Sequence, residues 1–214
     1  MPFDLPVLFV GVGAFVKLFM VRASPYARKV LVAAAERGLM DDIEILIANP
    51  HERPRALVAA NPLSKVPTLI ADDGTVHIDS FAICLFLDTL GSQPPLIPLD
   101  GPARWDIMRR HALADGVMDC SVTRRVESLM APEPDRQRWM ERQALTTARV
   151  LDRFEDTVDS LSGHIAIDAL TLACALSYLD FRFPHDEWRR DRPRLAAWHE
   201  DMEARESMRK TQFS

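Results

Sequence analysis

Three short segments of the sequence carry side chains that could bind a small polar molecule, and the first is Ser24-Pro25-Tyr26. A serine at the N-cap followed by a proline in the first turn is typical of an ordinary helix start. The start of a helix also favours an anion, because its backbone N–H groups are unpaired and its dipole is positive there. The segment therefore fits a simple cap, or a site where the Ser24 hydroxyl donates a hydrogen bond to a thiolate.

The second segment, NPLSKVPTL at residues 61–69, places Pro67 just before a run typical of a strand. One interpretation is a trans proline in an ordinary turn, since only about one X-Pro bond in twenty is cis in folded proteins. The other is a cis Val66–Pro67 bond, which would turn the preceding backbone outward. The N–H and C=O of Val66 would then be free to pair with an extended, peptide-like ligand.

The third segment is Asp79-Ser80, directly before a predicted helix. Either residue could cap that helix. A carboxylate beside a hydroxyl and free helix N–H groups could also bind an α-amino group and an α-carboxylate. Together the three segments could hold both ends of a small peptide.

The elements that must position these segments alternate between short strands and helices. The order is a β-α-β unit, a short helix, a hairpin and a further helix, which predicts a parallel crossover followed by an antiparallel pair in one sheet. The predicted strands are residues 16–21, 43–47, 68–71 and 75–78, and the predicted helices are residues 25–37, 54–60 and 80–90.

A stretch dense in glycine and proline at residues 92–101 is predicted to link this first domain, residues 16–91, to a second domain, residues 102–214. The second domain is expected to be entirely helical. An apolar stripe over residues 140–161 indicates one amphipathic helix, and residues 169–179, apolar nearly all round, indicate a central one. Residues 1–15 are interpreted as neither signal peptide nor membrane span, and remain an extension of unknown order.

Charge and composition exclude several classes of function. The net charge is −5 without a basic block, which disfavours nucleic-acid binding. The 3 cysteines are far apart and the 6 histidines have no ligand spacing, so neither a disulfide framework nor a metal site is expected. A reducing compartment is the natural interpretation.

Taken together, SPYARKV, NPLSKVPTL and DGTVHIDSFAICLFLD resemble the first domain of the glutathione S-transferase superfamily. HALADGVMD and CALSYLDFRF resemble the helical half of a bacterial, serine-type branch. The resemblance implies a thioredoxin-like α/β domain followed by an all-α bundle. It also implies a cytoplasmic homodimer that transfers glutathione to a small hydrophobic electrophile in detoxification.

Carried over by position, the resemblance makes Ser24 the catalytic hydroxyl that holds the glutathione thiolate. A cysteine does not occupy this position, so thiol exchange through a protein cysteine would lack its nucleophile. The alternatives are a glutathione-dependent reductase, peroxidase or lyase, or a non-catalytic glutathione-binding or regulatory protein with the same fold.

The resemblance also assigns the rest of the glutathione site. Pro67 would be a cis-proline, Val66 would pair through its backbone, and Asp79 with Ser80 would bind the γ-glutamyl group. Lys65 would help to hold the glycyl carboxylate, or would be a solvated surface lysine.

Three residues are candidates for the electrophile pocket, namely Tyr26, Met118 and Val122, with core packing as the alternative. Two positions depart from the family pattern. Ser64 stands where glycine is usual, which is harmless only at negative φ. Asp168 is expected to cap the central helix directly.

Overall fold

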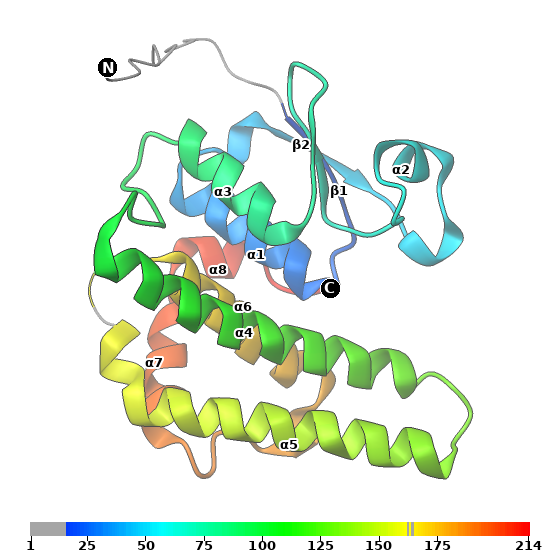
Figure 1. The fold of residues 1–214 in the computed structure, drawn as a ribbon, viewed down its shortest axis with the longest axis vertical. Helices are drawn as coiled ribbons and strands as arrows, with labels where there is room; N and C mark the ends of the chain where they lie inside the picture. Colours follow the sequence, from blue (N-terminus) through cyan, green and yellow to red (C-terminus); the bar gives the residue numbers. More distant parts are fainter. Residues whose placement is uncertain (1–15, 162, 164) are drawn as a thin grey trace.

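The first half of the chain folds as a four-stranded sheet between helices in the computed structural model, which describes residues 16–161, 163 and 165–214 (Figure 1). The strand order is β2-β1-β3-β4, with β1 and β2 parallel and the remaining pairs antiparallel. This confirms the predicted sheet. The elements are β1 (Val16–Met20), α1 (Pro25–Glu36), β2 (Ile43–Ile47), α2 (Arg55–Ala60), β3 (Thr68–Ile70), β4 (Val76–His77) and α3 (Ser80–Leu90).

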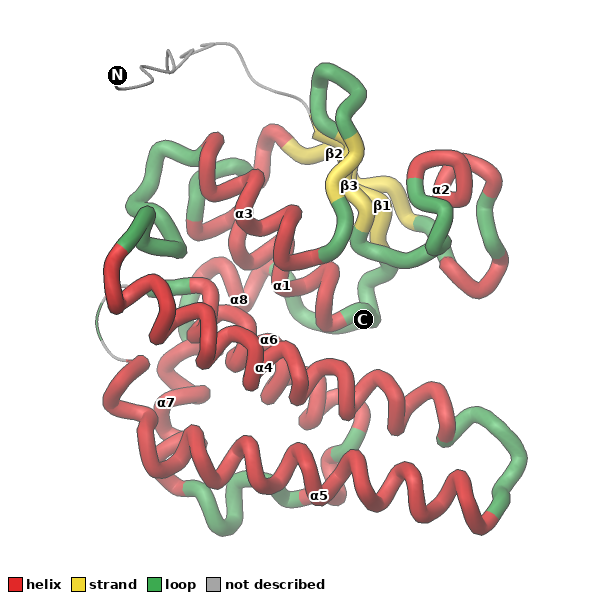
Figure 2. The backbone as a smooth tube through the Cα atoms, in the orientation of Figure 1, coloured by secondary structure: helices red, strands yellow, loops and turns green. Residues whose placement is uncertain are grey.

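Alternation along β1 produces the two layers that flank the sheet. Leu18 and Met20 face the large core that the sheet shares with α1, α3 and the helical half. Phe19 points the other way and packs with Ala48 and Leu57 beneath α2. Figure 2 shows α2 on one side of the strands and α1 with α3 on the other. Because successive side chains of a strand alternate, one five-residue strand supplies both cores.

The second half is helical, as expected. Its elements are α4 (Gly101–Glu127), α5 (Pro134–Thr157), α6 (Ile167–Arg182), α7 (Pro193–Glu203) and α8 (Glu206–Lys210). Helix α6 is buried along most of its length and lies at the centre of the bundle. The stripe over residues 140–161 is not one α-helix, since α5 ends at Thr157 and a 3₁₀ turn, Val158–Leu161, continues it. Among the described residues, no helix has the length and apolarity that crossing a membrane requires.

Asp168 does not cap α6, contrary to the prediction. The N-cap is Ala166, whose methyl side chain cannot form a capping hydrogen bond, and Asp168 lies two residues further on. Its carboxylate accepts from the Ala169 N–H at 2.9 Å and pairs with Arg110 Nε of α4 at 2.6 Å. The carboxylate therefore ties the first turn of α6 to a neighbouring helix.

Helix α1 belongs to both halves of the molecule. Lys29 has no exposed side-chain surface, and its Nζ lies 2.7 Å from the Asp115 carboxylate of α4. Arg28 is also buried and pairs with Glu203 of α7 at 3.2 Å, while donating to the Met208 carbonyl oxygen of α8. A buried charge without its partner is costly, so these pairs fix how α1 sits against the helical half.

Candidate functional site

The pairing register brings the three segments together at one edge of the sheet. Thr68 of β3 lies opposite Phe19 of β1, so Val66–Pro67 runs beside the residues that follow β1 and lead to Ser24. His77 of β4 lies opposite Leu69, so the residues after β4, beginning α3 at Ser80, arrive at the same edge. Strand pairing thus assembles a site from three segments that are separate in the sequence, between Ser24 and Ser80.

Ser24 is the N-cap of α1, and its Oγ accepts a hydrogen bond from the Ala27 N–H at 3.2 Å. The serine is buried, with 9% of its surface exposed. A hydroxyl has one proton to donate and two lone pairs, so capping uses only an acceptor site. The two interpretations of Ser24 are therefore compatible, because the same oxygen can cap the helix while its proton is donated to an anion.

The Val66–Pro67 peptide bond is cis. The backbone N–H and C=O of Val66 make no hydrogen bond to any other residue that the structure describes. Asn61 holds this turn from behind. It is buried, and its Nδ2 donates to Thr68 Oγ1 at 2.9 Å and to the Lys65 carbonyl oxygen at 3.2 Å. Sequence reasoning missed this role of Asn61, although asparagine is a common turn-forming residue.

Lys65 and Ser64 belong to the same turn, in which Ser64 is half-buried and its Oγ donates to the Pro50 carbonyl oxygen at 3.4 Å. Lys65 is exposed and has no ion-pair partner among the described residues. Ser64 has a φ of +50°, in the left-handed region, so the harmless negative-φ geometry is not the one adopted. A side chain in that region costs more than glycine would.

Asp79, not Ser80, is the N-cap of α3. Its Oδ1 accepts from the Phe81 N–H at 2.9 Å and from the Ala82 N–H at 3.2 Å, which leaves the second oxygen available to a cation. Ser80 is buried, and its hydroxyl has no hydrogen-bond partner within the described parts of the chain. An exposed carboxylate oxygen thus lies next to an unused hydroxyl at a helix start.

The predicted electrophile-pocket residues lie in three different environments. Tyr26 of α1 is half-buried and donates to Asp119 of α4. Burial, followed by the Asp119 hydrogen bond and charge, raises the Tyr26 pKa well above its ordinary value, so the phenol stays protonated. Val122 is half-buried, whereas Met118 is completely buried in the core. That position gives Met118 a packing role and no surface for a substrate.

All three cysteines are reduced and buried. Burial raises the pKa of Cys84 to about 12 and that of Cys174 to about 11, and it also raises the pKa of Cys120. A thiol with such a pKa is almost entirely protonated at neutral pH and is a poor nucleophile. Across residues 16–161, 163 and 165–214, no group of histidine, cysteine and carboxylate side chains could hold a metal ion.

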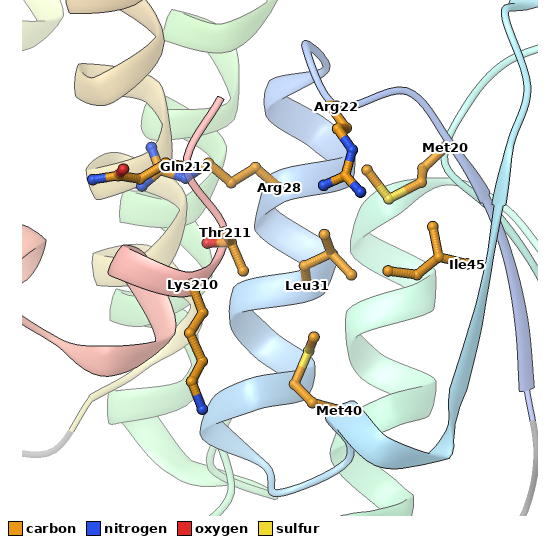
Figure 3. A pocket seen from close by; sticks show the side chains of 9 residues that line it. All are labelled: Met20, Arg22, Arg28, Leu31, Met40, Ile45, Lys210, Thr211 and Gln212. Atoms are coloured by element: carbon orange, nitrogen blue, oxygen red, sulfur yellow. The ribbon is translucent and has the colours of Figure 1, made fainter. Parts of the chain in front are cut away.

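A separate hollow lies on another face of α1, between that helix, the sheet and the end of the chain (Figure 3). Its apolar wall and its cationic and polar rim come from Met20, Arg22, Arg28, Leu31, Met40, Ile45, Lys210, Thr211 and Gln212. None of the predicted site residues lines it.

Comparison with known proteins follows the same division of the chain. The family models described as the N-terminal and C-terminal domains of glutathione S-transferase match residues 23–90 and 137–201. A glutathione transferase family member from Pseudomonas fluorescens Pf-5, solved with bound glutathione, is 41% identical. The match covers 93% of this chain and 99% of that one, with a TM-score of 0.89.

Two further relatives extend the comparison. A second Pseudomonas fluorescens Pf-5 family-member structure holds S-(propanoic acid)-glutathione, is 39% identical and has a TM-score of 0.82, covering 93% of this chain and 97% of that one. The uncharacterized GST-like protein YibF of Escherichia coli K12 is 29% identical over 92% of this chain and 98% of its own length. With both halves matched and the α/β and helical domains in the same order, the chain belongs to the glutathione S-transferase superfamily.

Proposed function

We propose that the protein is a glutathione transferase that binds glutathione along the edge formed by Ser24, Val66 and α3. The observation that carries the proposal is the unpaired backbone N–H and C=O of Val66, next to the chain that leads to Ser24. An unpaired backbone N–H and C=O of this kind can bind the backbone of an extended peptide. Bound glutathione in the 41% identical Pseudomonas structure supports the same ligand here.

The proposed orientation follows from charge. The γ-glutamyl end carries an ammonium and a carboxylate, which the free Asp79 oxygen, the Ser80 hydroxyl and the start of α3 complement. Val66 pairs with the cysteinyl unit, and Lys65 at the rim neutralises the glycyl carboxylate. The thiol then lies at Ser24.

Ser24 is proposed to act on the ionisation of the thiol. A free thiol with a pKa near 8.5 is only about a few per cent ionised at pH 7. A hydroxyl hydrogen bond and a helix start together lower the pKa by about one to two units, at about 1.4 kcal/mol for each unit. The thiolate attacks the electrophile, a bond from sulfur forms, and the leaving group departs with its electron pair while the thiol proton passes to solvent.

This route does not need a protein nucleophile, which agrees with the protonated state of the three buried cysteines. Disulfide reduction through a protein cysteine is thereby disfavoured. S-(propanoic acid)-glutathione in the 39% identical relative supports room for a second group on the sulfur. By resemblance to the family, we further propose a cytoplasmic homodimer with a role in detoxification and the domain limits given above.

The test is a titration of the protein with glutathione across pH, following heat and the ultraviolet absorbance of the thiolate together. Saturable binding, with thiolate formed below the pH at which free glutathione ionises, is the expected result. Binding without early ionisation would contradict the transferase mechanism and favour a carrier. Absence of binding at millimolar glutathione would refute the proposed site.

A further inference from the structure

An aromatic wall lies beside the start of α1, on the side that faces the helical half. The chain ends next to this turn (Figure 1), where the Phe213 ring lies 4.8 Å from the Arg28 guanidinium carbon. The backbone N–H of Arg28 donates to the Ser24 carbonyl oxygen at 3.0 Å, so Arg28 lies one helical turn after Ser24. Phe213 stacks on Phe181 of α6 at 5.2 Å and meets Tyr178 edge-on at 5.5 Å. These rings therefore lie between α6 and the first turn of α1, the turn that follows Ser24.

Two guanidinium groups without a carboxylate partner accompany this wall. Arg182 lies over the Phe181 ring at 4.0 Å and over Tyr178 at 5.9 Å, and its buried Nε has no hydrogen-bond partner. Arg125 of α4 is the second. Burial raises the pKa of Tyr178, and the charges of Arg182 and Arg125 both oppose that rise. Neither arginine forms an ion pair within the described residues.

The other arginines of α4, and Arg28 of α1, all have hydrogen-bond or ion-pair partners. Arg124, adjacent to Arg125, makes two hydrogen bonds to Asp186. Arg28 pairs with Glu203, and Arg110 pairs with Asp168. Paired cations of this kind stabilise the fold. Unpaired cations at a site lined by aromatic rings instead favour an anionic ligand.

Nearby carboxylates do not cancel this charge. Asp115 is neutralised by Lys29, and Asp119 accepts a hydrogen bond from the Tyr26 hydroxyl. On α4, Arg125 follows Val122 by three residues, so both occupy one face of the helix. Val122, which was predicted for the electrophile pocket, therefore lies on the same face of α4 as Arg125, whose guanidinium has no ion-pair partner among the described residues.

We propose that the second substrate of this enzyme is an electrophile that carries a carboxylate, held by Arg182 and Arg125 against Phe181, Phe213 and Tyr178. This inference rests on the proposed function, because it concerns the partner that the glutathione thiolate attacks. Two forks of N–H donors match the two oxygens of a carboxylate, and Phe181, which is 38% exposed, offers apolar surface to the body of the substrate. A neutral electrophile of the same shape leaves both guanidinium groups unused.

The test compares 4-chloro-3,5-dinitrobenzoate with its uncharged methyl ester. In both, the thiolate attacks the ring carbon that bears chlorine, a carbon–sulfur bond forms, chloride leaves with its electron pair, and the thiol proton passes to solvent. Each enzymatic kcat/KM is divided by the uncatalysed rate constant of the same compound. The normalised acid-to-ester ratio then measures recognition of the carboxylate alone.

The wild-type ratio is expected to be at least about tenfold, the size of one charge-assisted hydrogen bond. Arg182→Met and Arg125→Met keep an apolar stem and should each lower the acid-to-ester ratio severalfold. Arg182→Lys retains the positive charge and should lower the ratio less. Arg142→Met is the matched control, since Arg142 also lies over an aromatic ring, that of Trp139 at 5.5 Å, but on the exposed face of α5. The control should leave the ratio unchanged.

Calorimetric binding of the two purified glutathione conjugates gives a second readout that does not need turnover. Tighter binding of the acid conjugate, lost in Arg182→Met, supports the proposal even where chemistry is slow. Equal ratios for acid and ester in the wild type, or arginine variants that keep the wild-type ratio, overturn it while leaving the transferase intact. If neither glutathione nor any conjugate binds, the proposed function fails and the inference fails with it.

Discussion

Replacement of Ser24 separates its structural role from its chemical one. Ser24→Ala removes both the helix cap and the hydroxyl donor, and loss of such a cap costs about 1 kcal/mol of stability. Ser24→Gly also removes the hydroxyl, but glycine at an N-cap costs only about a few tenths of a kcal/mol. The two variants should therefore differ in the free energy of unfolding and agree in catalysis.

The catalytic effect can be estimated from the lost hydrogen bond. A hydrogen bond to a charged group contributes about 1.5 to 3 kcal/mol, which corresponds to about one to two pKa units of the bound thiol. At pH 7, an increase from about 7 to about 8 lowers the ionised fraction from about one half to about one tenth. We therefore expect kcat/KM at pH 7 to fall at least about fivefold in both variants, with much of the loss recovered above pH 9.

The assay is the pH dependence of kcat/KM with an aryl halide, together with thiolate absorbance in the binary complex and urea unfolding of each variant. Ser24→Thr retains a hydroxyl and serves as the control, with a pH profile near that of the wild type. A Ser24→Gly enzyme whose profile and bound thiolate match the wild type would refute the role of Ser24 as thiolate donor.

Three further predictions concern charge. Asp79→Asn keeps the oxygen that caps α3 but removes the negative charge. Glutathione affinity, measured by calorimetry, should therefore fall about tenfold at pH 7, while the free energy of unfolding should fall by less than about 1 kcal/mol. An unchanged affinity would exclude Asp79 from the site. Asp115→Ala leaves the fully buried Lys29 without its partner and should lower the free energy of unfolding by about 3 to 5 kcal/mol. Lys29→Met should lower it less, because the Asp115 carboxylate that remains is accessible to water. Denaturant unfolding of both single variants and of the double variant measures the difference, and equal losses would contradict the burial argument. Burial lowers the pKa of His111 from 6.5 to about 4, so between these pH values the unfolded state binds more protons than the folded state. The free energy of unfolding should therefore decrease as the pH falls from 6.5 towards 4. His111→Phe should weaken this pH dependence in denaturant unfolding, and a variant with the wild-type pH dependence would assign it to other groups.

Local sequence signals were sufficient for most of the first domain. The order of strands and helices allowed only a few sheets, and the observed one combines a parallel crossover with a hairpin. Ser24 and Pro25 predicted the start of α1 correctly, because capping is a property of adjacent residues. The isomer of Val66–Pro67 was left open by local pattern, and the family resemblance was what favoured cis.

Contacts between distant segments escaped local reasoning. Asp168 was expected to cap α6, but its partner is Arg110, 58 residues earlier in the chain. Met118 was a candidate for the electrophile pocket, but the packing of α4 against its neighbours buries it completely. Arg125 and Arg182 could not be distinguished from other arginines by sequence, since only the fold decides which cations find a carboxylate.

The shared helix α1 limits how freely the two halves can be recombined. A chimera that joins this first domain to the bundle of a relative would bring Lys29 against whatever residue that relative has at the position of Asp115. Without a carboxylate there, the helix that begins at Ser24 would have to shift or hydrate its buried lysine, and the serine would move with it. Successful domain exchange within the superfamily should therefore require the lysine and its acidic partner to be transferred as a pair.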